Sequence, residues 1–310
     1  MLIRQLQTLV AIADHGSFSA AARSLDTVQS NVSAHISRLE KHLGATLVDR
    51  TSGGLTAEGE VVLARARRIM NELEDIDGEI HSLGGSAAGE CRIGTIGTTA
   101  RWLMPPMLSQ MSRTHADVRI TVVEGATSSL LPRVASGELD AAVVHLPVSE
   151  AGLETKELFA EDLLLLVHHR HPLSNHTTIT LAELAEHPIL LAPLGTAQRR
   201  IVDRAAGARG VALKTQAAID GVRLMTSLAF DGYGPAIVPA SAIPVWLSGD
   251  FTRIAVPELP RRVVGWTQRT RPAPTRATLA VRDAAFASVE RHGSRQPGVS
   301  VDISPRAARF

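Results

Sequence analysis

The sequence predicts a protein of three parts: a small all-helical domain that ends in a hairpin, one long helix, and an α/β domain of two lobes. Two short helical patterns with a polar break between them occupy residues 17–40. Apolar residues then recur at heptad spacing from residue 62, and strand-like runs alternate with helical patterns beyond residue 89. The predicted domains are therefore 1–59, 60–88 and 89–292, and we expect 293–310 to form a flexible tail.

The first two helices are predicted from apolar spacing and from residues that end or begin a helix. Gly16 ends the first pattern, and Ser19 is the expected N-cap of the second, because its hydroxyl can accept a backbone N–H of the first turn. Small side chains at residues 20–22 allow a crossing helix to approach closely. Asp26 and Thr27 then supply a turn. The apolar stripe of the first helix comprises Ile3, Leu6, Leu9, Val10 and Ala13.

A third helix is predicted to bury one face and to present a polar face to DNA. The apolar side chains fall within an arc of about 80°; they are Val28, Val32, Ile36, Leu39 and Leu43. The polar face has short hydroxyl and amide side chains beside a cation, which suit base edges and phosphates. Its candidate DNA-binding residues are Gln29, Ser30, Asn31, Ser33, Ala34, Ser37 and Arg38. An ordinary solvated face is the alternative, but three ordered helices favour a helix-turn-helix.

A hairpin follows the third helix, and with it residues 2–59 match a known family. Residues 47–50, a Gly turn and residues 55–56 indicate a wing, whose Arg50 is placed to contact a phosphate. The region resembles the LysR-type transcriptional regulators, and the resemblance extends more weakly to about residue 290. The matching residues are Leu6, Phe18, Ala20–Ala22, Gln29–Ser33, Ile36, Arg38–Glu40, Leu43–Gly44, Leu47, Arg50, Leu55–Thr56 and Gly59.

The resemblance implies a sequence-specific transcriptional regulator that binds double-stranded DNA and responds to a small-molecule effector, with no cofactor and no enzymatic activity. Two positions depart from the family, which often has basic residues where this chain has Ala34 and Ser37. Residues 1–60 contain five basic and six acidic side chains. A DNA-binding domain without net positive charge is expected to bind DNA with modest affinity. More than one such domain is then needed for tight binding.

The heptad pattern from residue 62 predicts a dimerisation helix, and a dimer would have two DNA-binding domains. Its seam comprises Val62, Ala66, Ile69, Leu73, Ile76, Ile80 and Leu83. A homodimer fits DNA sites that are inverted repeats, because the two symmetries match. The alternative is a helix packed on its own domain. In the LysR-type family this segment is the linker helix, and assembly is commonly tetrameric; the resemblance therefore implies a homotetramer and leaves RNA polymerase as a candidate partner.

Residues 89–292 alternate strand-like and helical patterns, which predicts two Rossmann-like lobes with largely parallel sheets. The expected lobes are 89–163 with 268–292, and 164–267. They look like the family's effector domain, which is similar to periplasmic solute-binding proteins. The predicted strands are residues 91–96, 118–123, 141–144, 163–167, 189–191, 236–238 and 263–266.

Threonines at the turns from strand to helix are the candidate effector-binding residues. Free N–H groups and the helix dipole favour anions at such turns. By resemblance, Thr98, Thr99, Thr127 and Thr196 are the expected contacts. Plain N-capping is the alternative for each residue, but their joint placement favours a small carboxylate or another polar anion as the effector.

The remaining composition indicates a cytoplasmic protein without enzymatic or metal chemistry. No apolar run has the length of a membrane span, no signal-peptide pattern is present, and one cysteine, Cys91, excludes an intramolecular disulfide. No Walker A, GxSxG or GxGxxG motif occurs, and no catalytic residues are predicted. Residues 168–171 read HHRH, yet consecutive strand residues point to opposite faces and no Cys or carboxylate cluster completes a metal site.

Two other functions are compatible with part of the chain. A solute-binding or transport-associated α/β module would explain the second half but not residues 17–40. An α/β enzyme fused to a DNA-binding domain would need a catalytic constellation, and the sequence contains none of the motifs above. The last sixty residues have eleven arginines against four acidic residues. That excess could add nonspecific attraction to DNA, but a plain solvated tail is the favoured explanation.

Overall fold

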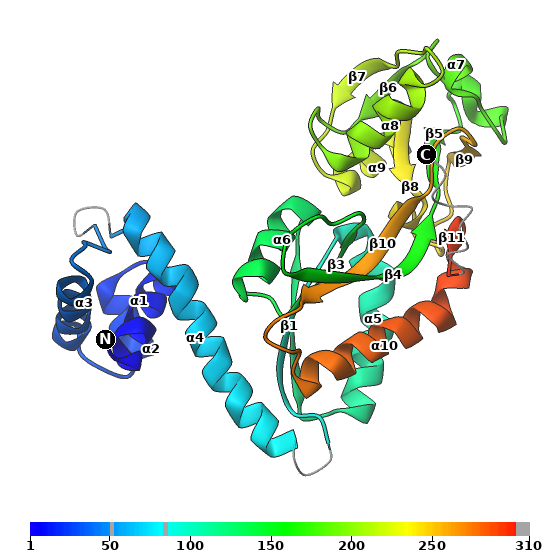
Figure 1. The fold of residues 1–310 in the computed structure, drawn as a ribbon. Helices are drawn as coiled ribbons and strands as arrows, with labels where there is room; N and C mark the ends of the chain where they lie inside the picture. Colours follow the sequence, from blue (N-terminus) through cyan, green and yellow to red (C-terminus); the bar gives the residue numbers. More distant parts are fainter. Residues whose placement is uncertain (50–52, 83–85, 302–310) are drawn as a thin grey trace.

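The computed structural model describes residues 1–49, 53–82 and 86–301, and it contains the three predicted parts. A small helical domain, which we call the reader domain (residues 1–56), lies on one side of a long helix. That helix leads to an α/β domain whose two lobes are stacked one above the other (Figure 1). No described helix has both the length and the apolar character needed to cross a membrane.

Three helices form the reader domain: α1 (Ile3–His15), α2 (Phe18–Ser24) and α3 (Gln29–Leu43). Gly16 ends α1 in the left-handed conformation with a φ of 73°, as predicted. The N-cap of α2 is Ser17 and not Ser19. The helix begins at Phe18, and the Ser17 hydroxyl accepts the N–H of Ala20 at 3.2 Å.

The predicted apolar stripe of α3 is buried only in its middle. Val32, Ile36 and Leu39 lie in the reader core, whereas Val28 and Leu43 are exposed. Val28 is the N-cap residue and Leu43 is the last helical residue. Because the buried residues lie between those two ends, the core formed with α1 and α2 covers only the central turns of α3.

The wing is a minimal hairpin that is fixed to the start of the long helix. Val48 and Leu55 form an antiparallel bridge, and the Thr56 N–H donates to the Leu47 carbonyl at 3.0 Å. A Cβ on Gly59 would collide with that Leu47 carbonyl, so glycine is required where the helix crosses the strand. Arg50, the predicted phosphate contact, lies outside the described residues.

The long helix α4 (Ala57–Ser82) begins three residues before the predicted start, and its heptad seam has two different halves. Ala66 is fully buried in the reader core and Val62 packs against it. Farther along, Ile76 and Ile80 are 56% and 62% exposed. Both halves of α4 therefore pack within the chain, the first on the reader core and the second on lobe 1, but Ile76 and Ile80 of the seam face solvent. Leu83, the last seam residue, lies outside the described residues.

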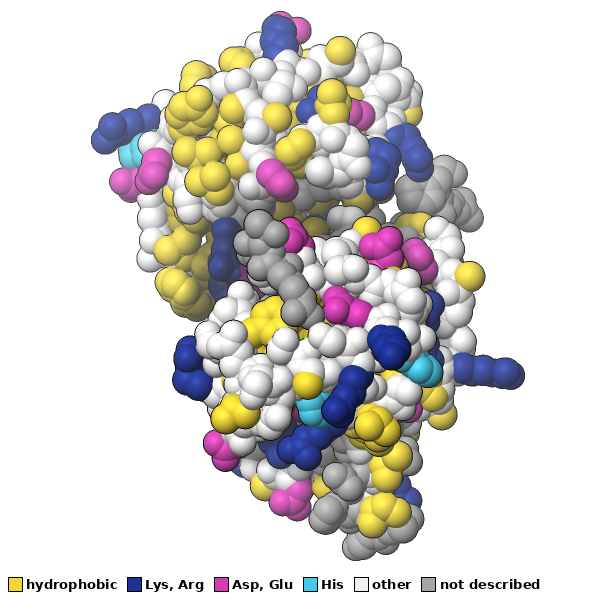
Figure 2. All heavy atoms as spheres, turned by 90° about the vertical axis from the view of Figure 1, so that its left-hand side faces the viewer, with side chains coloured by type: hydrophobic (Ala, Val, Ile, Leu, Met, Phe, Trp, Pro, Cys, Tyr) yellow, Lys and Arg dark blue, Asp and Glu magenta, His cyan; other side chains and the backbone are white. Residues whose placement is uncertain are grey.

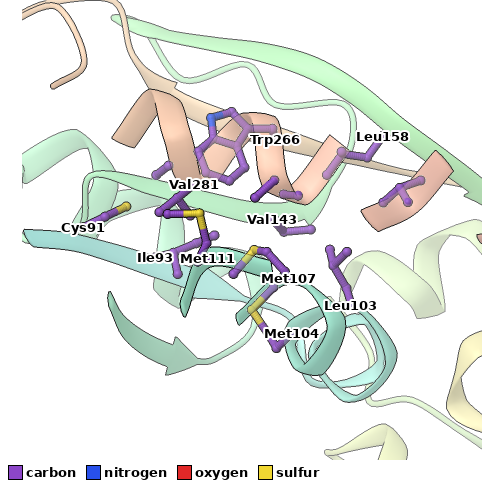
Figure 3. Packing of buried hydrophobic residues seen from close by; sticks show 14 of the residues in the cluster. Cys91, Ile93, Leu103, Met104, Met107, Met111, Val143, Leu158, Trp266 and Val281 are labelled. Carbon is purple, nitrogen blue, oxygen red and sulfur yellow. The ribbon is translucent and has the colours of Figure 1, made fainter. Parts of the chain in front are cut away.

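Lobe 1 has a mixed sheet in the order β11-β4-β10-β3-β1-β2, and parallel pairing links β1 with β2 and β3. Figure 3 shows Met104, Met107 and Met111 of α5 gathered with Ile93 and Val143 below Trp266. The strands are β1 (Gly89–Thr95), β2 (Val118–Glu124), β3 (Ala141–His145), β4 (Leu153–Glu161), β10 (Arg262–Arg269) and β11 (Val299–Ser300); the helices are α5 (Gly97–Thr114), α6 (Thr127–Ser136) and α10 (Arg276–His292).

Lobe 2 has a five-stranded sheet in the order β7-β6-β8-β5-β9. The strand β5 pairs antiparallel with both β8 and β9, so this sheet is also mixed and not largely parallel. The strands are β5 (Leu163–His168), β6 (Pro188–Leu191), β7 (Lys214–Ala218), β8 (Ala236–Pro239) and β9 (Phe251–Ala255); the helices are α7 (Leu181–Leu184), α8 (Ala197–Gly207) and α9 (Val222–Phe230), with short 3-10 turns at η1 (Pro172–Asn175) and η2 (Ala240–Ala242).

Two predicted boundaries are wrong. Residues 263–266 belong to lobe 1, because β10 lies between β3 and β4; the chain leaves lobe 2 between residues 256 and 261. Residues 293–301 are also part of lobe 1, since η3 (Gly293–Arg295) leads into β11, which pairs with Glu161 and Ala160 of β4. The rest of the predicted tail lies outside the described residues. Sequence patterns did not indicate β4, because its first half is polar and exposed.

Candidate DNA-binding face and effector site

The polar face of α3 presents most of the predicted DNA-binding residues to solvent. Gln29, Ser30, Asn31, Ser37 and Arg38 are exposed, while Ser33 and Ala34 are half-buried. The Asn31 side-chain amide donates to the Thr27 hydroxyl at 3.0 Å. Its carbonyl oxygen is then available as an acceptor at the start of the helix, which suits the donors on base edges.

The described part of the reader domain carries exposed charges of both signs. Figure 2 views the molecule from the side on which this domain lies, and both basic and acidic side chains are visible on that face. Of the basic residues of α3, Arg38 and Lys41 are exposed. The distribution agrees with the balance of five basic and six acidic side chains in residues 1–60.

In the effector domain, two of the predicted threonines belong to one polar network at the ends of the lobe 1 strands. Thr98, at the start of α5, accepts a hydrogen bond from Nη2 of Arg262 at 2.9 Å. Nη1 of Arg262 lies 2.9 Å from Nε2 of His145, and the His145 backbone N–H donates to the Thr127 hydroxyl at 3.2 Å. The ends of β1, β2 and β3 meet here, and with them two of the four predicted threonines.

Arg262 is the centre of this network and is almost completely buried. Its Nε donates to Oε1 of Glu161 at 2.6 Å, and the Glu161 side chain is fully buried. Burial lowers the pKa of Arg262, while the charge of Glu161 and its hydrogen bond act in the opposite direction. A buried pair of this kind is stable only while both partners remain and their hydrogen bonds are satisfied.

His145 is held neutral beside Arg262. Burial lowers its pKa well below the usual value, and the Arg262 charge lowers it further. Because a guanidinium can only donate, Nε2 of His145 must accept, and the ring proton is on Nδ1. That Nδ1 is buried and has no hydrogen-bond partner among the described residues. The ring therefore has one buried donor, Nδ1, that is unused within the described residues.

The network also crosses from lobe 1 to lobe 2 through Ser241 of η2. Oε2 of Glu161 accepts the Ser241 N–H at 3.0 Å, and Nη2 of Arg101 donates to the Ser241 carbonyl at 2.6 Å. A second contact between the lobes joins Glu124, at the end of β2, to Arg223 of α9. The Glu124 carboxylate lies so close to Gly97 that a Cβ there would collide with it.

The other two predicted effector contacts are placed differently. Thr99 is fully buried, and its hydroxyl has no partner among the described residues. Thr196 lies in lobe 2 as the N-cap of α8, where its hydroxyl accepts the Arg199 N–H at 3.2 Å and donates to the Pro193 carbonyl at 2.9 Å. This is the geometry of the capping alternative, and no described hydrogen bond links Thr196 to Arg262.

Sequence reasoning did not identify Arg262, Glu161 or His145. A signal was nonetheless present, because each charged or polar residue adjoins a run of buried apolar residues. Glu161 follows residues 158–160, and Arg262 precedes residues 263–264. Buried charges are rare unless they are paired, so two opposite charges next to core strands indicate a pair. Which charges meet cannot be read from their spacing.

Comparisons with known proteins identify both the DNA-binding region and the α/β domain. Residues 3–60 match the family model of the bacterial regulatory helix-turn-helix protein, lysR family, and residues 84–288 match the LysR substrate binding domain. A probable hydrogen peroxide-inducible genes activator from Mycobacterium leprae is 31% identical, over 91% of this chain and 88% of that protein. The DNA-binding transcriptional dual regulator OxyR from Escherichia coli is 30% identical, over 87% of this chain and 90% of OxyR.

Solved structures share the fold. Full-length CbnR in complex with its target DNA covers 92% of this chain and 100% of its own, with a TM-score of 0.70 and 24% identity. A full-length OxyR variant from Pseudomonas aeruginosa covers 92% of this chain and 98% of its own, with a TM-score of 0.69 and 24% identity. The two family matches together cover most of the sequence. The chain belongs to the LysR family and is a DNA-binding transcriptional regulator.

Proposed function

We propose that this regulator responds to a small anionic effector that binds where the lobe 1 strands end, next to Thr98. The observation that carries the proposal is the hydrogen bond from Arg262 to Thr98, because Arg262 also holds Glu161, which contacts lobe 2. An anionic group at Thr98 would compete with Glu161 for the Arg262 donors. The contact of Glu161 with Ser241 would then change, and with it the relative placement of the lobes.

The start of α5 adds to the preference for an anion. The N–H groups of Gly97 and Thr98 belong to the first turn, where no helical carbonyl can accept them. The positive end of the helix dipole favours negative charge at the same point. Together with Nη2 of Arg262, which donates to the Thr98 hydroxyl, these groups form a set of hydrogen-bond donors at the start of α5 that suits a carboxylate.

The exposed half of the α4 seam supports the proposal of a homodimer through the linker helix. Ile76 lines a groove of about 640 Å³ between α4 and residues 271–272, together with Ile69 and Leu73. The helix of a second copy would cover these apolar side chains and bring two reader domains together for an inverted-repeat DNA site. The proposal extends to a homotetramer and to contact with RNA polymerase, which the family resemblance implies.

Ile76→Asp tests the homodimer. Because a charge in the seam would be buried in the dimer, we expect the variant to sediment as a monomer at concentrations where the wild type is a dimer or a larger assembly. Val61→Asp is the matched control, since Val61 is 66% exposed on the same helix but lies off the seam. Unchanged sedimentation of the Ile76 variant would exclude this interface.

A DNA-binding experiment tests whether the polar face of α3 contacts DNA. Selection from genomic fragments followed by gel shifts should yield sites that bind in a sequence-selective and salt-sensitive way. Arg38→Ala should weaken that binding by about tenfold or more, because one charged contact is lost from each reader domain. Arg113→Ala removes the same charge from an exposed position on α5 and should leave binding unchanged. Equal losses in both variants would contradict the assignment of α3.

Peroxide sensing is the second candidate, because the curated relatives above are named for peroxide-inducible genes or as OxyR. Cys91 is the one cysteine of this chain, and it is fully buried in the lobe 1 core, where burial raises its pKa. The reactive form of a cysteine is the thiolate, so this thiol is poorly suited to peroxide. We expect hydrogen peroxide to leave DNA binding unchanged in the wild type and in Cys91→Ala alike; a response that depends on Cys91 would favour peroxide sensing.

A further inference from the structure

The HHRH sequence at residues 168–171 has a geometry that the sequence pattern did not predict. His168 is the last residue of β5, and the chain turns at His169, so the two side chains no longer alternate across the strand. Their rings lie side by side, with centroids 4.4 Å apart and planes inclined by 35°. The expectation that consecutive histidines point to opposite faces is therefore wrong at this strand end.

A carboxylate from a distant part of the chain completes the group. Asp250 directly precedes β9, which pairs with β5 so that His168 lies opposite Phe251. One ligand atom from each of His168, His169 and Asp250 lies within 4.8 Å of the other two. Within the described ranges, no other group of three His, Cys, Asp or Glu side chains meets this condition.

Backbone contacts fix the orientation of His169 relative to Asp250. The Asp250 carbonyl accepts the His169 backbone N–H at 2.8 Å and lies 3.2 Å from Nδ1 of the same residue. Because a carbonyl can only accept, the neutral ring has its proton on Nδ1 and a lone pair on Nε2. Oδ1 of Asp250 lies 3.8 Å from Nδ1, so the exposed carboxylate must rotate toward Nε2 for both to bind one metal. A hydrogen bond from the second ring nitrogen to a carbonyl is the usual way in which proteins orient a histidine that binds a metal.

His168 is held by packing on one side. A Cβ on Gly232 would lie 3.3 Å from Cγ of His168, so the imidazole is in close contact with the backbone of the turn after α9. Nδ1 of His168 accepts the Arg170 N–H at 3.1 Å. A metal that binds His168 through either nitrogen replaces at most that one exposed hydrogen bond. Such a bond has a modest net contribution, small compared with metal coordination.

We propose that His168, His169 and Asp250 bind a divalent first-row transition metal such as Zn²⁺. Two imidazoles and one carboxylate suit Zn²⁺, Co²⁺ or Ni²⁺, whereas Mg²⁺ and Ca²⁺ prefer sets made of oxygen ligands alone. The ligand atoms need to approach one another, and exposed side chains can do this by rotation; Asp250 is 78% exposed. Three protein ligands leave a coordination position for water or another ligand.

The site is separate from the network around Arg262. It lies at the end of β5, while Glu161 lies two residues before the start of the same strand. A metal at this end of lobe 2 is therefore not part of the proposed anion site. The metal proposal does not depend on the identity of the effector.

Titration of the full-length, tag-free chain with Zn²⁺ by calorimetry tests the proposal. We expect one Zn²⁺ per chain, and the absorption of Co²⁺ should change on binding to the same site. His169→Gln and Asp250→Asn should each weaken Zn²⁺ binding by about tenfold or more, since each removes one ligand. Mg²⁺ should not compete.

His187→Gln is the matched control. His187 forms another histidine pair with His171, with ring centroids 5.6 Å apart, and no carboxylate joins that pair within the described residues. We expect this variant to bind Zn²⁺ like the wild type, and circular dichroism should show all variants folded. Absence of Zn²⁺ binding by the wild type would overturn the proposal. Equal binding by the His169 and Asp250 variants, loss of binding in the His187 variant, or competition by Mg²⁺ would also overturn it.

Discussion

The two lobes of the effector domain use their polar residues in opposite ways. In lobe 1, the strand ends converge on the buried pair of Arg262 and Glu161, and Thr98 is bonded to that pair. In lobe 2, Thr196 stands at a similar turn from strand to helix, but its hydroxyl is used within its own turn. The same residue type at the same kind of turn thus joins a buried charge network in one lobe and caps a helix in the other.

This difference indicates how the two lobes divide their roles in the proposed response. Lobe 1 holds the buried charges that would recognise an anion, and it contacts the linker helix through Asn71, whose amide donates to the Gly137 carbonyl at 2.8 Å. Lobe 2 meets the network through the backbone of Ser241. We therefore expect lobe 2 to move relative to lobe 1, while lobe 1 passes the change to α4.

The largest expected effect comes from Arg262→Met. The variant leaves the Glu161 carboxylate buried without its partner, which costs about 3–5 kcal/mol of unfolding free energy. Arg261→Met is the control, because Arg261 pairs with Asp162 in a half-exposed position and should cost less than about 1 kcal/mol. Chemical denaturation measures both. Similar losses in the two variants would mean that the lobe 1 pair is an ordinary surface contact.

Thr196→Ala addresses the lobe 2 side of the comparison. Loss of the cap should cost about 1 kcal/mol of stability, and Thr196→Ser should restore most of it. A panel of mono- and dicarboxylates, tested by thermal shift, should give the same ranking with this variant as with the wild type. If Thr196→Ala keeps its stability and loses the carboxylate shifts, Thr196 is an effector contact and the contrast between the lobes fails.

Asp75→Asn tests the contact of the linker helix with lobe 1 through pH. Burial first, and then the charge of Asp140, raise the pKa of Asp75 to about 7 from 3.8. The folded chain binds this proton more tightly than the unfolded chain. Stability therefore falls as pH rises from about 4 to 7, and the full loss of stability from ionised Asp75 is reached above pH 7. After allowance for solvent screening, the variant should gain on the order of 1 kcal/mol at pH 8.

The added stability of Asp75→Asn should disappear as the pH approaches 4. There Asp75 is protonated in the folded chain and becomes protonated in the unfolded chain as well. Denaturation at a series of pH values, with one protein concentration throughout, gives the comparison. Glu60→Gln, an exposed substitution at the other end of the same helix, serves as the control. A gain that does not vary with pH would show that Asp75 is not the titrating group.

The smallest expected effect belongs to the contact between Glu124 and Arg223. Both side chains are largely exposed, so Glu124→Gln should change stability by less than about 1 kcal/mol. Its carboxylate lies against Gly97, at the start of α5, where an effector anion would bind. Carboxylates from the panel should therefore give larger thermal shifts with Glu124→Gln than with the wild type. Glu186→Gln, in an exposed pair within lobe 2, should show no such increase.

Local patterns predicted the reader domain and α4, whereas contacts between distant residues escaped prediction. The face of α3 and the seam of α4 repeat with helical spacing, so each is visible within about thirty residues of sequence. Arg262 and Glu161 are 101 residues apart, and Thr98 and Arg262 are 164 apart. Only the folded sheet brings them together.

The errors in the sequence analysis have local physical causes. The side chains of His168 and His169 do not diverge, because β5 ends between them and the sequence pattern does not show that end. Thr196 is indistinguishable from Thr98 in sequence, since capping and ligand binding require the same hydroxyl at the same turn. Residues 293–301 have no apolar periodicity, yet two residues of pairing with β4 place them in lobe 1.

The response of Thr98→Ala to a carboxylate tests the central claim most directly. The probe is a carboxylate from the panel that shifts the melting temperature of the wild type and changes its gel shift on a selected DNA site. We predict that Thr98→Ala binds that DNA with unchanged affinity but no longer responds to the carboxylate. An unaltered response, or equal loss of DNA binding and response, would contradict the assignment of the anion site to lobe 1.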